Sequence, residues 1–293
     1  MESNILTSVL MPIALGVIMF GLGLSLTIDD FKRVYKYPKA VFVGLFCQLL
    51  ILPVACFGLI YLFGLSPELA VGLMLLAASP GGPTANLYSH LFGGNVALNI
   101  TLTAVNSVLA LFTLPLIVNF SIQHFMHLHE VVPLQLSKVI EVFLIVMIPV
   151  SIGMWVNSKS KKMTTKIAGM VKILSAIFLV LIIVGAIYKE KQNIVVYFKQ
   201  AGLAALSFNI LSLMLGYFMA RIFSINKSSS MAIAMEVGIH NGTLAIYIAL
   251  IVIGNSVVSI PAAIYSIIMF FTALLFGYLF NVKKNTLEPV VKE

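Results

Sequence analysis

Almost the whole chain consists of apolar segments about 20 residues long, separated by short polar stretches. An α-helix of that length crosses the hydrocarbon core of a bilayer. Hydrophobic residues make up 60% of the sequence and charged residues only 10%, whereas about a quarter of the residues are charged in a soluble domain. The sequence therefore predicts an all-α polytopic membrane protein, with a lipid bilayer around most of its surface.

We predict nine transmembrane helices in a single membrane domain that covers residues 1–293. Their approximate ranges are 4–27, 39–63, 68–93, 95–120, 132–157, 166–188, 197–222, 228–254 and 257–281. The first apolar segment lacks the basic leader and the small-residue cleavage site of a secretory signal peptide. It is therefore predicted to be the first membrane helix.

The basic residues predict how these helices are oriented. Nine helices place most of the 18 Lys and Arg residues on one side of the membrane. This set comprises Lys32, Arg33, Lys36, Lys39, Lys159, Lys161, Lys162, Lys166, Arg221, Lys227, Lys283, Lys284 and Lys292, whereas Lys189, Lys191 and Lys199 fall opposite. Because basic loops stay in the cytoplasm, we expect a multi-pass protein of the inner (plasma) membrane with its N-terminus outside and its C-terminus inside. The net charge of +8 then indicates topology and not nucleic-acid binding.

Two predicted helices are interrupted near their middle. Residues 77–86 read AASPGGPTAN, and residues 236–242 read EVGIHNG. In lipid every backbone group needs an internal partner, so a broken helix is stable at that depth only around a cavity or a protein-lined site. The two interruptions are five helices apart and thus lie in antiparallel helices, as in an inverted repeat of helices one to four and six to nine. Such pairs are typical of the binding site of a secondary transporter.

The polar residues near the interruptions are mostly oxygen donors. Glu236 lies near the middle of the membrane, where a carboxylate costs several kcal/mol and usually serves an ion or substrate path; the alternative is a protonated carboxyl bonded to a neighbouring helix. Asn99, Thr103 and Asn106 form a stripe at i, i+4 and i+7. Asn86 ends the first interruption. Helix–helix hydrogen bonding is the competing interpretation for these residues, but carboxylate, amide and hydroxyl oxygens suit a hard cation.

Gln48 and His240 admit more than one role. Gln48 could join two helices by hydrogen bonds or line an ion path. His240 could be a neutral core residue, or it could carry a proton, because imidazole titrates near physiological pH. The sequence lacks the metalloprotease motif H-E-x-x-H and offers no other catalytic set, so no catalytic residue is predicted and a hard monovalent cation is the only metal expected.

Several motifs together resemble the bile acid:sodium symporter family, in particular bacterial homologues of the apical sodium-dependent bile acid transporters. They are MFGLGLSLTIDDF in the first helix, the Gln48–Pro53 pattern, SPGGPTAN, GGNVALN and EVGIHNG. They occur in the family's order over nearly the whole chain. The resemblance implies a core domain in which two discontinuous helices cross at the membrane midplane, and a panel domain that moves against it. The core would comprise about 39–120 and 197–281, and the panel about 4–27 and 132–188.

The resemblance also implies two sodium sites, with Na⁺ as the coupling ion. The first would be formed by Asn86, Asn99, Thr103 and Glu236. The second would be formed by Gln48, Glu236, His240 and the backbone carbonyls of Val237 and Ile239. Because the carboxylate of Glu236 belongs to both sites, each bound ion favours its ionised form and the sites are coupled.

Some positions depart from the family pattern. Ala85 and Asn99 stand where serine is common, and His240 replaces the usual glutamine. A His–Asn pair in the last helix of many members is replaced here by Met269 and Phe270. The last replacement weakens the expectation that bile acid is the substrate.

The resemblance implies a secondary active transporter that couples sodium entry to uptake of a small organic anion by alternating access. The anion would be a bile acid or a smaller carboxylate such as a pantoate-like acid. Thr84 and Asn241 are the predicted substrate contacts, because half-helix N-termini present free N–H groups and positive dipole ends to an anion. The alternative is a proton-coupled or sodium-independent carrier that uses Glu236 and His240. A channel and an intramembrane hydrolase are alternatives from other functional classes.

Overall fold

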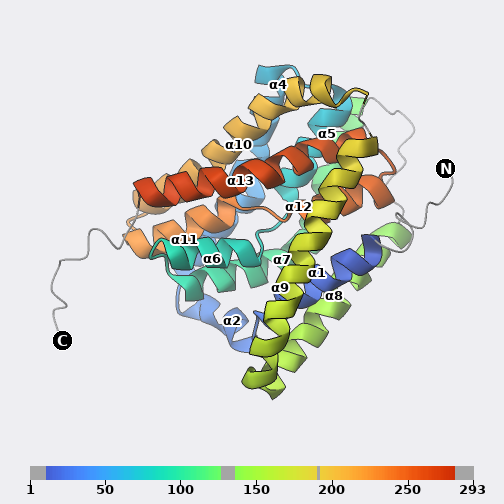
Figure 1. Ribbon diagram of the computed structural model, residues 1–293. Coiled ribbons are helices and arrows are strands. Elements are labelled where there is room, and N and C mark those ends of the chain that lie inside the picture. Colours follow the sequence, from blue (N-terminus) through green and yellow to red (C-terminus); the bar gives the residue numbers. More distant parts are fainter. Residues whose placement is uncertain (1–10, 127–135, 190–191, 281–293) are drawn as a thin grey trace.

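The computed structural model describes residues 11–126, 136–189 and 192–280 (Figure 1). Helices form nearly all of this part of the chain. In order they are α1 (Met11–Leu24), α2 (Ile28–Lys32), η2 (Arg33–Tyr35), α3 (Pro38–Phe46), η3 (Cys47–Ile51), α4 (Leu52–Phe63), α5 (Pro67–Ala78), α6 (Pro83–Leu91), α7 (Val96–Met126), α8 (Leu136–Lys159), α9 (Lys161–Lys189), α10 (Ile194–Ile222), α11 (Lys227–Gly238), α12 (Gly242–Tyr247), η4 (Ile248–Val252), η5 (Val257–Ser259) and α13 (Ile260–Leu279). The all-helical membrane architecture predicted from the sequence is therefore present.

Six helical segments of the described residues are long and apolar enough to cross a membrane. They are Pro38–Phe63, Val96–Met126, Ile140–Lys159, Thr164–Gly185, Ile194–Ile222 and Val257–Leu279. A seventh is obtained if Met11–Leu24 and Ile28–Tyr35, which meet at 68°, count as one bent span. The sequence predicts nine. Of the nine predicted ranges, 68–93 and 228–254 are each divided at an interruption into helices too short to span the bilayer alone, and 4–27 is represented only by the bent pair.

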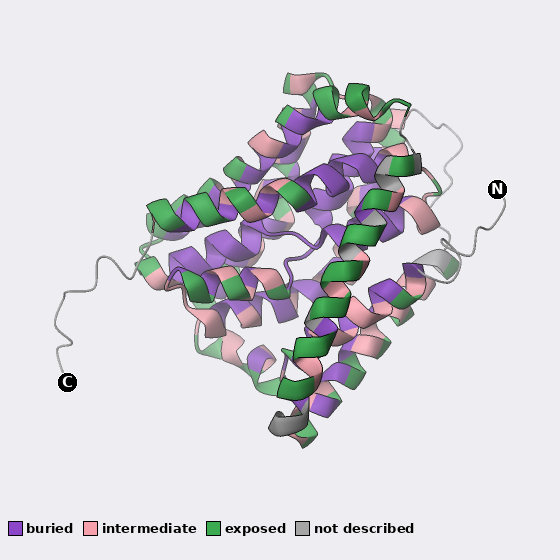
Figure 2. Cartoon of the chain, viewed as in Figure 1, coloured by how far each residue is buried: buried purple, intermediate pink, exposed green. Residues whose placement is uncertain are grey.

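The centre of the molecule is formed by the first halves of the interrupted segments. Every residue of Leu69–Ala78 in α5 and of Ser229–Gly238 in α11 is buried, which Figure 2 shows as the purple interior. α7, α10 and α13 pack around these two helices. By contrast, α9 exposes Ile173, Ile177 and Val184, as expected for a helix that faces lipid.

Outside this centre, the close packing of α1 against α8 depends on glycine. A Cβ atom on Gly23 of α1 would collide with the backbone of Val150 in α8, and one on Gly153 of α8 would collide with the backbone of α1 at Phe20, Gly23 and Leu24. Small residues allow membrane helices to approach in this way. α9 lies against both α1 and α8 (Figure 1). The three helices thus form one packed group.

The turn after α6 is joined to the start of α11. The N–H of Asn95 donates to the carbonyl of Ser228 at 2.9 Å, and the hydroxyl of Ser228 donates to the carbonyl of Gly93 at 2.9 Å. Gly93 has a φ of +74°, a conformation that glycine adopts without strain. These bonds hold α6, the second half of the first interrupted segment, beside α11, the first half of the second.

Candidate functional site

Both interruptions expected from the sequence are present, and they lie against each other. Pro80 and Pro83 explain the first one, since proline ends the preceding helix and favours the first position of the next. Between the two segments the N–H of Asn241 donates to the carbonyl of Pro80 at 2.8 Å, and Gly81 and His240 form a β-bridge. Some of the backbone groups released by the breaks therefore satisfy one another.

Glu236, in the last turn of α11, is only 2% exposed. Its Oε2 accepts a hydrogen bond of 2.6 Å from the hydroxyl of Thr103 and a long one of 3.5 Å from Nδ2 of Asn99. The same Nδ2 donates to the carbonyl of Ala232 at 2.8 Å. The polar stripe on α7 therefore contacts the carboxylate directly.

Several buried oxygens of this carboxylate and of the helices packed against α11 have no hydrogen-bond partner within the described part of the chain. They are Oε1 of Glu236, Oδ1 of Asn99 and Oδ1 of Asn86. Asn86 belongs to α6, which packs against both α7 and α11. Buried polar atoms normally have partners, and oxygens of this kind are the ligands of hard cations. The first predicted set thus has the donor chemistry that sodium requires.

Gly81 allows the first interruption to approach the carboxylate. A Cβ atom at this position would collide with the carboxyl group of Glu236. The Gly81→Ala substitution is therefore expected to displace the carboxylate and to raise the half-saturating sodium concentration at least about tenfold, which corresponds to about 1.4 kcal/mol. Sodium titration of the thermal stability of the purified protein measures this change.

Gly82→Ala is the matched control for Gly81→Ala. A Cβ atom on Gly82 would meet nothing within 4 Å, and its φ of −149° is open to any residue. If Gly81→Ala and Gly82→Ala bind sodium equally well, the close approach of Gly81 has no role in the site.

Gln48 and His240 meet at the end of α5. Nε2 of Gln48 and Nδ1 of His240 lie 3.1 Å and 3.0 Å from the carbonyl oxygen of Ser79. Because a carbonyl only accepts, Nδ1 carries the proton of His240 and Nε2 is left as an acceptor. That Nε2 and Oε1 of Gln48 are both buried without a partner in the described residues. The second predicted set therefore offers one amide oxygen and one imidazole nitrogen, and nitrogen is the poorer ligand for sodium.

Local sequence explains where Gln48 lies. Pro53 has no N–H to donate, and the turn before it widens, so that the N–H of Leu52 donates five residues back to Cys47. Such widened turns are frequent at functional sites. Here the turn contains Gln48.

The break also releases backbone oxygens near His240. In a continuous helix the carbonyl of Val237 would accept from the N–H of Asn241, which instead donates to Pro80. Ile239 is extended, with φ −114° and ψ 98°, so its carbonyl leaves the helical direction. Both carbonyls named in the sequence prediction thus lie at the break itself.

A cavity of about 390 Å³ adjoins the break. Its lining comprises Ile18 and Gly21 of α1, Ser25 directly after α1, Ala168, Val171, Ser175 and Ala176 of α9, Gly82, Pro83, Thr84 and Leu87 at the start of α6, Ile239–Thr243, and Ser266, Met269 and Phe270 of α13. The predicted contacts Thr84 and Asn241 are therefore on the same wall. The first turns of α6 and α12 both border this cavity, which otherwise is mostly apolar.

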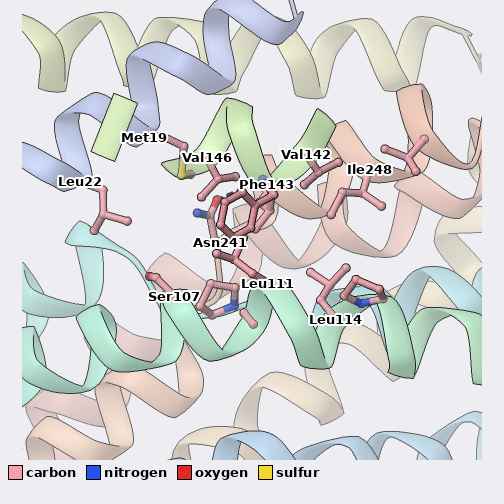
Figure 3. Close-up of a pocket in the computed structure, with 15 residues that line it drawn as sticks. Met19, Leu22, Ser107, Leu111, Leu114, Val142, Phe143, Val146, Asn241 and Ile248 are labelled. Atoms are coloured by element: carbon pink, nitrogen blue, oxygen red, sulfur yellow. Dashed lines mark hydrogen bonds between the residues drawn. The ribbon is translucent and has the colours of Figure 1, made fainter. Parts of the chain in front are cut away.

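A second, apolar cavity of about 40 Å³ lies between α1, α7, α8 and α12 (Figure 3). Met19, Leu22, Leu114 and Phe143 are among its lining residues. Asn241 borders this cavity as well as the larger one. Its side chain accepts from the N–H of Leu244 at 3.1 Å and so caps α12. Asn241 thus separates two cavities.

Two residues at the break were not expected from the sequence. Asn209 in α10 and Tyr265 in α13 both donate to the carbonyl of Gly238. An isolated polar residue within an apolar membrane helix is the signal that could have indicated them.

A family profile and several known proteins match most of this chain. A sequence profile of the Sodium Bile acid symporter family matches residues 12–197. The probable sodium/metabolite cotransporter BASS1 of Arabidopsis thaliana is 30% identical over 256 residues, which are 87% of this chain and 62% of that protein. The uncharacterized sodium-dependent transporter YocS of Bacillus subtilis is 31% identical over 259 residues, 87% of this chain and 78% of YocS.

The ileal sodium/bile acid cotransporter of Oryctolagus cuniculus is 27% identical over 242 residues, 82% of this chain and 69% of that protein. The chain spans less than two thirds of the length of the plant relative and about three quarters of the Bacillus one. The resemblance seen in the sequence motifs is confirmed: the chain is a multi-pass membrane protein that belongs to the sodium bile acid symporter family, a family of transporters and not of enzymes.

Proposed function

We propose that this protein is a secondary active transporter that couples sodium entry to uptake of a small organic anion. The observation that carries the proposal is the buried carboxylate of Glu236, surrounded by unpartnered oxygens where two helix breaks meet. The names of two relatives, a sodium/metabolite cotransporter and a sodium-dependent transporter, support sodium coupling.

The first sodium ion would bind Asn86, Asn99, Thr103 and Glu236. The second would bind Gln48, Glu236 and the carbonyls of Val237 and Ile239, with His240 beside it. A buried anion is stable only if it is paired, and a cation on each side of Glu236 provides that pairing. Binding of one ion keeps the carboxylate ionised for the other, which couples the two sites.

The substrate anion would occupy the larger cavity. The first turns of α6 and α12 border it, and free N–H groups and helix dipoles at such N-termini stabilise a carboxylate or sulfonate. Thr84 and Asn241 supply side-chain contacts. The volume of about 390 Å³ and the apolar Met269 and Phe270 on its wall favour a small carboxylate, such as a pantoate-like acid, over a bile acid.

Transport would proceed by alternating access. The packed group α1, α8 and α9 corresponds to the panel, about 4–27 and 132–188, and the remaining helices to the core, about 39–120 and 197–281. We propose nine spans in an inverted repeat whose two discontinuous helices cross, with the N-terminus outside and the C-terminus in the cytoplasm. In that orientation the larger cavity, which reaches Ser25 at the end of α1, faces the cytoplasm, and the small apolar cavity is the closed outer side.

Uptake by proteoliposomes at fixed pH tests the proposal. Small radiolabelled carboxylates are added with an inward sodium gradient, with potassium in its place, and with a proton gradient alone. Saturable uptake that requires sodium supports the symporter. Uptake that follows the proton gradient and ignores sodium supports the second candidate, a proton-coupled carrier, which the unpartnered Nε2 of buried His240 favours. A conductance without substrate saturation would indicate a channel.

His240→Gln separates the two roles of this residue. A glutamine amide can donate to the carbonyl of Ser79 and offers an oxygen in place of the imidazole nitrogen. We expect the half-saturating sodium concentration to fall several-fold, about the effect of one charge-assisted contact, and the sodium-to-substrate ratio to be retained or to rise. If sodium affinity, stoichiometry and pH dependence all stay at wild-type values, His240 is a structural residue only.

A further inference from the structure

The open end of α11 is held by side chains from two other helices. Nδ2 of Asn209 in α10 and the hydroxyl of Tyr265 in α13 both donate to the carbonyl of Gly238, each at 2.9 Å. In a continuous helix this carbonyl would accept from the N–H of Gly242, which instead donates to the carbonyl of His240 at 3.0 Å. The two side chains therefore replace the helical bond that the break removes.

This arrangement is rigid and dry. Asn209 and Tyr265 are both 0% exposed. The hydroxyl of Thr272 donates to Oδ1 of Asn209 and so fixes the orientation of its amide. The ring of Tyr265 meets the imidazole of His240 edge-on, with a centroid distance of 5.4 Å, and Phe208 stacks on the imidazole at 5.8 Å while also contacting the ring of Tyr265. The same two helices thus immobilise both the Gly238 peptide and the neighbouring His240.

The hold on Gly238 determines which carbonyls of the break are free. Two donors occupy both lone pairs of its oxygen, so Gly238 itself cannot bind a cation. The carbonyls of Val237 and Ile239, on either side of it, are the ones that have left the helical pattern. Because successive peptide planes share a Cα atom, fixing the Gly238 carbonyl limits the directions of its two neighbours.

We propose that Asn209 and Tyr265 are positioning residues, which hold the Gly238 peptide so that the carbonyl oxygens of Val237 and Ile239 point at the second sodium ion. This inference rests on the proposed sodium-coupled function. The bond between Thr272 and Asn209 already joins α10 to α13, so joining these helices does not require the bonds to Gly238. Instead Asn209 and Tyr265 both donate to one backbone atom of a third helix, at the residue where that helix ends.

Sodium titration of the thermal stability of the purified full chain tests the inference. The detergent-solubilised protein is unfolded in increasing sodium chloride, with potassium chloride keeping the ionic strength constant. Tyr265→Phe removes one donor and keeps the ring, and Asn209→Leu removes the other at similar volume. Each is expected to raise the half-saturating sodium concentration about fivefold to tenfold, the effect of one hydrogen bond. In the double variant the half-saturating sodium concentration is expected to rise by more than the product of the two single-variant factors.

Tyr217→Phe is the matched control. It removes a tyrosine hydroxyl from α10, and its ring also packs against α13, at Phe276. Residue 217 lies eight positions from Asn209 along the helix, about 12 Å. Its sodium titration is expected to match that of the wild type. Thr272→Val is a milder second variant, which loosens Asn209 without removing a donor to Gly238, and is expected to show a smaller rise of about twofold.

The outcomes distinguish failure of the positioning role from failure of the proposed sodium coupling. If the unfolding temperature in potassium falls but the half-saturating sodium concentration of Tyr265→Phe and Thr272→Val stays at the wild-type value, the residues are structural and the positioning role is refuted. If the wild type itself responds to sodium no more than to potassium, the proposed sodium coupling fails and the inference fails with it. A sodium response in the wild type that weakens in these variants but not in Tyr217→Phe supports both.

Discussion

Glu236→Gln is expected to abolish sodium-dependent stabilisation and sodium-driven uptake while the protein stays folded. The amide has the volume of the carboxyl group and can still accept from the hydroxyl of Thr103. It removes the negative charge, and a buried ion that loses its partner is destabilised by about 3 kcal/mol or more. The half-saturating sodium concentration should therefore rise by at least about 100-fold, as measured by sodium titration of the unfolding temperature.

Glu68→Gln is the control for this charge removal. Glu68 lies in the first turn of α5, on the same interrupted segment as Gly81 but at the opposite end of α5 from the break. Its sodium titration should match that of the wild type. An unchanged sodium affinity in Glu236→Gln would refute the ligand role of the carboxylate and, with it, the proposed ion coupling.

Gly153→Leu is expected to have the second largest effect, on the stability of the α1, α8 and α9 group. A side chain at this position meets the backbone of α1 at Phe20, Gly23 and Leu24, and a backbone cannot change rotamer to avoid it. Overpacking typically costs about 1–3 kcal/mol, which lowers the unfolding temperature by roughly 2–12 °C in a protein of this size. We expect uptake to be lost at the same time, because α1, α8 and α9 could not keep their close packing.

Gly169→Leu provides the comparison for Gly153→Leu. Gly169 lies in α9, and a Cβ atom there would meet nothing within 4 Å. The stability and uptake of Gly153→Ala should lie between those of Gly153→Leu and the wild type. Equal stability and uptake in Gly153→Leu and Gly169→Leu would show that the contact between α1 and α8 does not depend on close approach.

The features that short motifs encode could be predicted from the sequence. Proline and glycine located both interruptions, and helical spacing located the stripe that reaches Glu236. The number of spans was the less certain quantity, because a helix divided at its middle no longer has the length that defines a span. Six or seven segments of the described residues meet that length, against nine expected.

The partners of backbone atoms could not be predicted from the sequence. His240 and the carbonyl of Ser79 are 161 positions apart, and neither the contact of Gly81 with Glu236 nor the two donors to Gly238 leaves a motif. Such contacts are determined by where helices from distant parts of the chain pack. Side-chain types and motifs therefore indicated the chemistry of the site, and only the fold shows which main-chain contacts hold its segments together.

The backbone pairing between the two interruptions has a consequence for how members of this family diverge. The bond from Asn241 to Pro80 and the bridge between Gly81 and His240 use main-chain atoms, and most amino-acid replacements leave those atoms in place. Evolution can therefore alter the surrounding side chains, and with them the preferred solute, while the joint between the segments persists. A chain about 30% identical to its relatives therefore needs little sequence identity at this joint to keep it.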